Sequence, residues 1–170
     1  MKALGRKLAS EAHAKGICKE WYYRLRETND MHTLVRMFLE GIDFCIKEDY
    51  PSAKFFKIFD GIRQRYGIFM DEQINVKDAE YVVAFGKCAG MAEYTDYSAG
   101  QIFVKHESEL TIAVSCNSFV MVDMFDDSTV EISGYDNAKI IVNQYGGNLI
   151  TTADNENVVI KVIHKQSKTY

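Results

Sequence analysis

The residues best suited to chemistry lie in the tripeptide Lys105-His106-Glu107, which joins an ammonium, an imidazole and a carboxylate. Successive residues of a strand point to opposite faces, so His106 would not meet both of its neighbours. Asp126 follows His106 at a spacing of twenty, and a His–Asp pair can serve as an acid–base dyad. The same pair is also typical of a solvated surface contact, and we favour that interpretation.

Two further groups could act beside His106. Lys105 is followed at the same spacing by Phe125 and Tyr145, which predicts either a cation–π ladder or packing of the lysine stem over the rings. Paired carboxylates, as in solenoid glycosidases, could come from Asp123, Asp126 or Asp127. The candidate surface-interaction residues are therefore Lys105, His106, Asp123, Phe125, Asp126 and Tyr145.

Other chemistry has no matching pattern. The chain contains neither G-x-x-x-x-G-K-[ST] nor G-x-G-x-x-G, so no phosphate-binding loop is predicted. Ser115-Cys116 has no histidine in register that could activate a nucleophile. The cysteines form no C-x-x-C pair and the histidines are scattered, so we expect no catalytic, cofactor-binding or metal-ligating set. The four cysteines are Cys18, Cys45, Cys88 and Cys116, and we expect reduced thiols in a cytoplasmic protein.

These residues lie on a ten-residue repeat that dominates the second part of the chain. Each unit begins with aliphatic, any, aliphatic, which places two side chains on one face of a short strand, and ends in polar, turn-like residues. The first aliphatic position is Leu110, Val120, Val130, Ile140, Ile150 and Ile160. At a period of twenty, Val82, Ile102, Val122, Val142 and Val162 align, as do Asn117, Asn137 and Asn157. Asparagine tolerates a left-handed backbone, and its amide can bond the same amide one coil away, so we expect an asparagine ladder at a corner.

Short strands at this spacing are typical of two architectures, an antiparallel meander closing into a sandwich and a parallel β-solenoid. A solenoid requires a constant coil length because each side chain lies on its counterpart in the next coil, whereas a meander does not. Six units without a change of phase favour the solenoid, with two units in each coil of twenty residues.

The first part of the chain has helical periodicity. We expect about three amphipathic helices: residues 2 to 15 with a bend near Gly16, a second helix that begins after Asp30, and a third with Pro51 in its first turn. The predicted fold is α+β, with a helical N-terminal cap over residues 1–77 and a β-solenoid over residues 78–170.

The charge of the chain divides at the same boundary. Residues 1–77 carry fourteen basic and eleven acidic residues, or +3, whereas residues 78–170 carry six and thirteen, or −7. Such a balance gives no signal for direct nucleic-acid binding. No segment approaches the ~20 apolar residues of a membrane helix, so no membrane association is expected.

Residues 102–106 and 142–147 (Ile-Phe-Val-Lys-His and Val-Asn-Gln-Tyr-Gly-Gly), with residues 16–21 and 40–45, resemble a family of Bacteroides-type gut bacterial proteins. The resemblance implies a helical N-terminal segment and a C-terminal β-solenoid, and it brings no activity and no functional residues. The repeat is also similar in architecture to bacterial scaffold solenoids such as bactofilins, and fold alone does not fix function.

An uncovered terminal coil exposes unpaired backbone groups. Either the short basic tail after His164 or a second subunit would cover it, so we expect a homo-oligomer. We therefore predict a non-enzymatic interaction or assembly module without cofactors. Two alternatives remain: an acidic mimic of DNA, since residues 78–160 carry three lysines against thirteen acids, and an enzyme acting on carbohydrate or acyl substrates.

Overall fold

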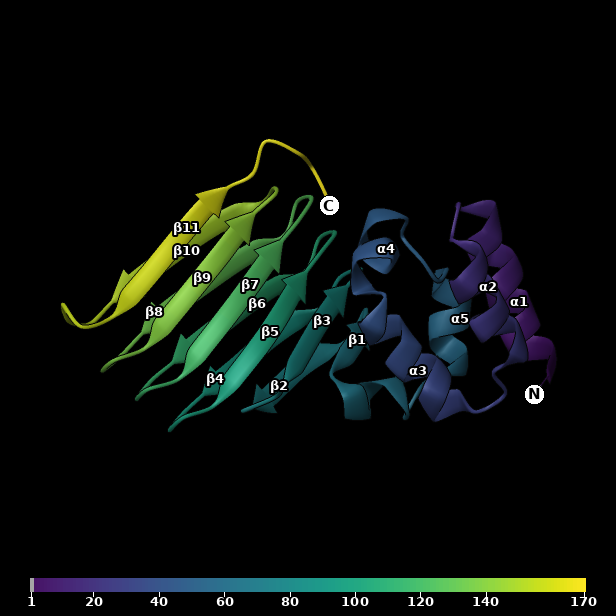
Figure 1. The fold of residues 1–170 in the computed structure, drawn as a ribbon. Coiled ribbons are helices and arrows are strands. Elements are labelled where there is room, and N and C mark those ends of the chain that lie inside the picture. Colours follow the sequence, from purple (N-terminus) through teal and green to yellow (C-terminus); the bar gives the residue numbers. More distant parts are fainter. Residues whose placement is uncertain (1) are drawn as a thin grey trace. The chain divides into compact units, whose positions relative to one another are not determined.

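The computed structural model describes residues 2–170, with side chains from Leu4 onward, and divides into two compact units. The first unit extends to Tyr66 and is helical, and the second covers Gly67–Thr169 and contains every strand (Figure 1). The order of helices followed by strands confirms the predicted α+β class.

The helical unit contains more and shorter helices than predicted. Its expected second helix is divided at Gly41, where the backbone leaves the helical region with ψ near +32°. None of the described helices has the length and apolar composition that a membrane crossing requires. The helices are α1 (Lys2–Ala14), α2 (Lys19–Glu27), α3 (Met31–Glu40), α4 (Ile42–Lys47), α5 (Ala53–Ile58) and the 3-10 helix η1 (Arg63–Tyr66).

The predicted helix starts were correct at α3 and wrong at α5. Asp30 caps α3, because its carboxylate accepts hydrogen bonds from the Thr33 hydroxyl at 2.7 Å and from the Thr33 backbone N–H at 2.6 Å. These two bonds hold the pKa of Asp30 below its usual value. Pro51 does not lie in a first turn: Ser52 is the N-cap of α5, and the proline precedes it after a cis peptide bond.

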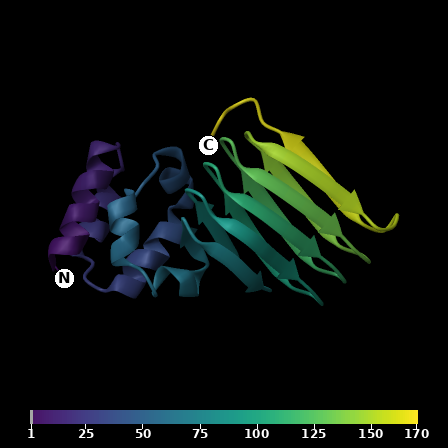
Figure 2. The ribbon, with the colours of Figure 1, turned by 180° about the vertical axis from the view of Figure 1, so that it is seen from behind.

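The second unit is a parallel β-solenoid, as predicted, and not an antiparallel meander. All strand pairs are parallel and link alternate strands, so one sheet (sheet A) has the order β1-β3-β5-β7-β9-β11 and the other (sheet B) has β10-β8-β6-β4-β2. Figures 1 and 2 show the two sheets as stacked layers of short strands. The strands are β1 (Ile68–Met70), β2 (Gln73–Lys77), β3 (Tyr81–Phe85), β4 (Ala89–Tyr94), β5 (Ala99–Val104), β6 (Glu109–Val114), β7 (Phe119–Met124), β8 (Thr129–Gly134), β9 (Lys139–Gln144), β10 (Asn148–Ala153) and β11 (Val159–His164).

The solenoid begins before residue 78, because β1 and β2 already belong to the two sheets. The period of twenty does not reach this first coil, because β1 pairs with β3 at a spacing of fifteen and β2 with β4 at sixteen. Between β4 and β5 the repeat is hidden by glycine. A Cβ at Gly100 would lie 2.4 Å from the ring of Tyr94, which is fully buried in the core. The aromatic ring thus fills the space that aliphatic side chains fill in later coils, and its burial raises the pKa of Tyr94 above the ordinary value.

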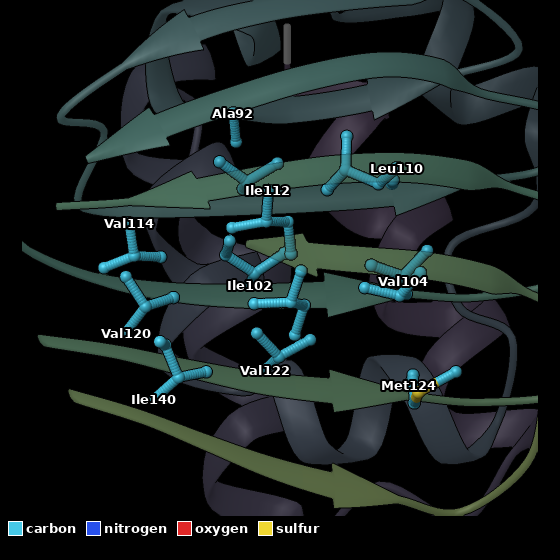
Figure 3. Packing of buried hydrophobic residues seen from close by; sticks show 14 of the residues in the cluster. Ala92, Ile102, Val104, Leu110, Ile112, Val114, Val120, Val122, Met124 and Ile140 are labelled. Carbon is cyan, nitrogen blue, oxygen red and sulfur yellow. The ribbon is translucent and has the colours of Figure 1, made fainter. Parts of the chain in front are cut away.

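The core lies between the two sheets, where alternate residues of every strand point inward. Figure 3 shows this core, with Ile112 from one sheet next to Ile102 from the other at its centre, and Leu110 and Val122 farther out. These side chains are buried almost completely, as are their counterparts Ile132 and Val142 in the following strands. The predicted alignment at a period of twenty is confirmed in sheet A, where Ile102 pairs with Val122 and Val122 with Val142.

Strand β10 breaks the ten-residue phase. Partners in sheet B are elsewhere twenty residues apart from β4 onward, but β10 pairs with β8 at a spacing of nineteen, Leu149 with Val130 and Thr151 with Ile132. The prediction of six units without a change of phase is therefore wrong at Ile150, which points away from the core and is 55% exposed.

A short corner causes this slip. The regular corners contain four residues, but only residues 145–147 separate β9 from β10. Gly147 has a φ of +80°, and a Cβ there would lie 2.2 Å from the Ser128 carbonyl oxygen, so the tightened corner requires glycine. The next corner, residues 154–158, has one residue more, which returns β11 to a spacing of twenty from β9.

The slip can be tested with two isoleucines of sheet B. We expect Ile132→Ala to lower the free energy of unfolding by about 2–5 kcal/mol, because it empties a fully buried site. Ile150→Ala removes an exposed side chain and should change stability by less than about 0.5 kcal/mol. Chemical denaturation of both variants measures the difference, and an equal loss would contradict the register of β10.

Candidate functional site

The corners that follow the strands of sheet A carry most of the predicted site residues. The regular four-residue corners have a left-handed second residue, with φ between +55° and +62° at Asp96, His106, Cys116, Asp126 and Asp136. Their fourth residue is small, and it is fully buried at Ser108, Ser118, Ser128 and Ala138. This shared geometry stacks each corner residue on its counterpart twenty positions away.

The structure stacks Phe125 on Tyr145, and Lys105 occupies the same corner position one coil earlier. The Phe125 and Tyr145 rings lie 4.7 Å apart at 16°, and the ammonium of Lys165 lies 5.6 Å from the centre of the Tyr145 ring. Lys105 is 7% exposed, and its Nζ lies 3.5 Å from the carboxylate of Asp126. A buried ammonium needs such a counter-charge, so Asp126 holds the Lys105 ammonium at this corner.

His106 and Asp126 do lie one above the other, and the backbone of His106 makes the hydrogen bond to the Asp126 carboxylate. The Asp126 carboxylate accepts the backbone N–H of His106 at 3.2 Å, while His106 Nδ1 accepts the backbone N–H of Gly86 at 3.0 Å. Asp136 accepts the backbone N–H of Cys116 at 3.0 Å in the same way. At these corners the side chain of the left-handed residue thus binds the backbone one coil earlier, which is a structural role.

Asp123 lies apart from these corners, in β7. It faces away from the core yet is only 6% exposed, and its Oδ1 accepts a hydrogen bond of 2.6 Å from Asn143 Nδ2. Asn143 pairs with Asp123 across β7 and β9, so the bond runs along the stack. Asp127 is exposed in the corner beside Asp126. Asp123 and Asp126 therefore both accept hydrogen bonds from neighbouring coils.

The asparagine positions differ from expectation in their backbone. Asn137 Nδ2 donates to Asn117 Oδ1 at 3.4 Å, which is one rung of a ladder. Asn157 lies in the five-residue corner, where its backbone N–H instead donates to Asn155 Oδ1 at 2.8 Å. The expected left-handed conformation at Asn117 and Asn137 is wrong, because it belongs to the preceding residues Cys116 and Asp136.

The last coil, defined here as β10, β11 and the corner between them, is the most exposed part of the solenoid core. Its inner row consists of Leu149, Thr151, Ala153, Ile160, Val162 and His164, and all of these are half-buried or exposed. Their partners one coil earlier include Val130, Ile132, Ile140 and Val142, which are fully buried. Two more apolar side chains of this coil are exposed on its outer side, Ile150 by 55% and Val159 by 52%.

Sequence reasoning identified the terminal coil as a place needing cover but not which residues it exposes. The slip in β10 moves Thr151 into the inner row and Ile150 out of it, and only the Gly146-Gly147 pair signals this change.

Across residues 2–170 the structure shows no group of three or more His, Cys, Asp or Glu side chains arranged to hold a metal ion. Comparison with protein-family models, curated proteins and solved structures finds no match to this chain.

The structural role of Asp126 can be tested against its neighbour. We expect Asp126→Ala to lower the free energy of unfolding by about 1–3 kcal/mol, because it leaves the Lys105 ammonium and the His106 N–H without this acceptor. Asp127→Ala changes an adjacent, exposed carboxylate and should have little effect. Thermal and urea unfolding would contradict the assignment if both variants lost the same stability.

Proposed function

We propose that this chain is a non-enzymatic interaction module whose binding element is the last coil of its solenoid. The observation that carries the proposal is the exposure of this coil: β10 ends sheet B, β11 ends sheet A, and their inner row is open to solvent. Within residues 2–170 no further strand pairs with either edge.

Both sheets thus offer the same kind of site at one end. An edge strand presents unpaired N–H and C=O groups, and a partner strand can add to it by completing the ladder. The main-chain bonds supply affinity, and the side chains of the inner row supply selectivity because they would be buried only in the complex. Natural edges are commonly protected by proline, bulges or several charges, whereas β10 has no charged residue and β11 contains only Lys161 and His164.

The other predicted site residues support a binding role over a catalytic one. His106 Nδ1, Asp126 and Asp123 each accept a hydrogen bond from a neighbouring coil. A general acid or base must instead reach a substrate proton from its own side chain. Asp136 likewise directs its carboxylate to the Cys116 N–H, so the corner acids contribute to coil stacking.

Hydrogen exchange followed by mass spectrometry tests the proposal. We expect backbone amides of Asn148–Ala153 and Val159–His164 to exchange quickly in the dilute chain, since they lie at the edges of both sheets. Raising the concentration of the chain, or adding an extract of the cells that make it, should protect these two segments, because partner strands would take up their N–H groups. The buried strands β6 and β7 serve as the internal control and should be protected throughout. Protection that appears elsewhere on the chain while the last coil stays unprotected would contradict the proposal.

A further inference from the structure

We propose that the partner of the last coil is a second copy of this chain, docked last coil to last coil about a two-fold axis. The inference rests on the proposed function and specifies its partner and geometry. Two features of β10 and β11 support this arrangement. One is the identity of the residues whose backbone N–H and C=O groups are unpaired, and the other is the position of these residues along the strands.

The free backbone groups of β11 belong to its inner-row residues. Val159 and Lys165 donate their N–H groups to the strand before, at the carbonyls of Ala138 and Gln144. In a parallel ladder alternate residues direct both backbone groups to the same neighbour, so Val159, Lys161 and Ile163 face β9. The residues between them, Ile160, Val162 and His164, therefore direct their N–H and C=O groups to the open edge.

The same rule applies to β10 with the other parity. Asn148 and Asp154 donate their N–H groups to Ser128 and Gly134 of the preceding coil, so the even-numbered residues face β8. Leu149, Thr151 and Ala153 then face the open edge. In both strands the residues that carry free backbone groups are also those whose side chains form the exposed inner row.

A two-fold axis through Val162 turns β11 onto its own copy in antiparallel orientation. Ile160 then faces His164 of the second copy, Val162 faces itself, and all three edge residues form hydrogen-bonded pairs. On the outer side Lys161 faces Ile163 of the second copy, so the two lysines are not directly opposed. Like charges directly opposite one another would destabilise such a pair.

The same two-fold axis also pairs β10 with its own copy. Thr151 and Val162 are each the fourth residue of a six-residue strand, in sheets that enclose one core. An axis that passes through both pairs Leu149 with Ala153 of the second copy and places Thr151 against itself. The two threonine hydroxyls can hydrogen-bond across the axis, as paired threonines do on neighbouring strands. One operation therefore closes the open edges of both sheets.

A second copy fits this edge better than stacking on the opposite end of the solenoid. There β1 has only three residues, so it could pair with half of the six-residue β11. The self-docked arrangement forms about twelve backbone hydrogen bonds, which matches the ~10 ± 5 of a typical protein interface. Charge also permits it: residues 78–160 carry −10, yet neither edge strand contains an acidic residue.

Two adjacent threonines provide a matched test in the full-length chain. Thr151 and Thr152 are both exposed on β10, but Thr151 lies in the inner row and Thr152 on the outer face. In sedimentation equilibrium we expect the unaltered chain to dimerise reversibly. Thr151→Lys should weaken the dimer at least about tenfold, because it places two ammonium groups in the closed seam. Thr152→Lys should leave the dimer constant within about twofold.

Cross-linking gives a second readout that does not depend on the lysine variants. A residue on a two-fold axis meets only its own copy, so Val162→Cys should form an intermolecular disulfide on mild oxidation. Hydrogen-bonded antiparallel pairs have Cα atoms about 5.5 Å apart, which is within disulfide range. Val159→Cys, on the same strand but away from the axis, should not. The unaltered chain measures the background from exposed Cys18.

The outcomes separate this inference from the function on which it rests. A chain that stays monomeric at all concentrations, while cell extract still protects the last coil, would overturn the second copy and retain the interaction module. Filaments without a limiting dimer, equal effects of both lysine variants, or a Val159→Cys cross-link as efficient as that of Val162→Cys would also overturn the two-fold arrangement. Absence of protection in either condition would overturn both proposals.

Discussion

The backbone ladder between coils is the interaction on which the solenoid depends. Along sheet A, N–H groups donate to carbonyls twenty-one residues earlier, as from Gln101 to Glu80, Phe125 to Val104 and Lys165 to Gln144. From β3 to β11 this bond repeats because each coil of sheet A returns to its starting position after twenty residues. Buried backbone groups without partners are costly, so coil length, corner geometry and side-chain stacking are all constrained by it.

The corners show how strictly this constraint acts on sequence. A four-residue turn with a left-handed second residue closes them, and its small fourth residue fits inside the coil. Left-handed backbone is unfavourable for most residues, and its occurrence at His106 and Cys116 shows that the ladder overrides local preference. At His106, Asp126 and Asp136 the side chain at this position accepts a backbone N–H one coil earlier. His106 and Asp126 look chemically active in the sequence because aspartate and histidine are suited to that structural bond.

The repeat made the solenoid, its twenty-residue coil and its inner row predictable, because a core between two sheets imposes aliphatic residues at fixed spacing. The first coil could not be predicted because it is shorter than the period of twenty: β1 pairs with β3 at a spacing of fifteen, and β2 with β4 at sixteen. The repeat is also hidden between β4 and β5, where Tyr94 fills the core beside Gly100. The partners of Lys105 and the left-handed position could not be inferred, since periodicity gives the register of residues but not their backbone angles or side-chain directions. The divided helix at Gly41 was missed for a similar reason: both halves share one apolar stripe.

The slip at β10 gives the exposed end of the solenoid its particular character. In an interior coil, a spacing of nineteen would bury Thr151 in the core. It would also shift every later strand by one residue relative to the twenty-residue period, unless a longer corner followed at once. The chain has that longer corner, and its Val158 fills the space over Gly134, where a Cβ would lie 2.5 Å from the valine side chain. The slip is therefore confined to one strand, and that strand is at an edge. There it places threonine, instead of the large aliphatic Ile150, in a row that water can reach, and it keeps the backbone pattern of an open edge strand.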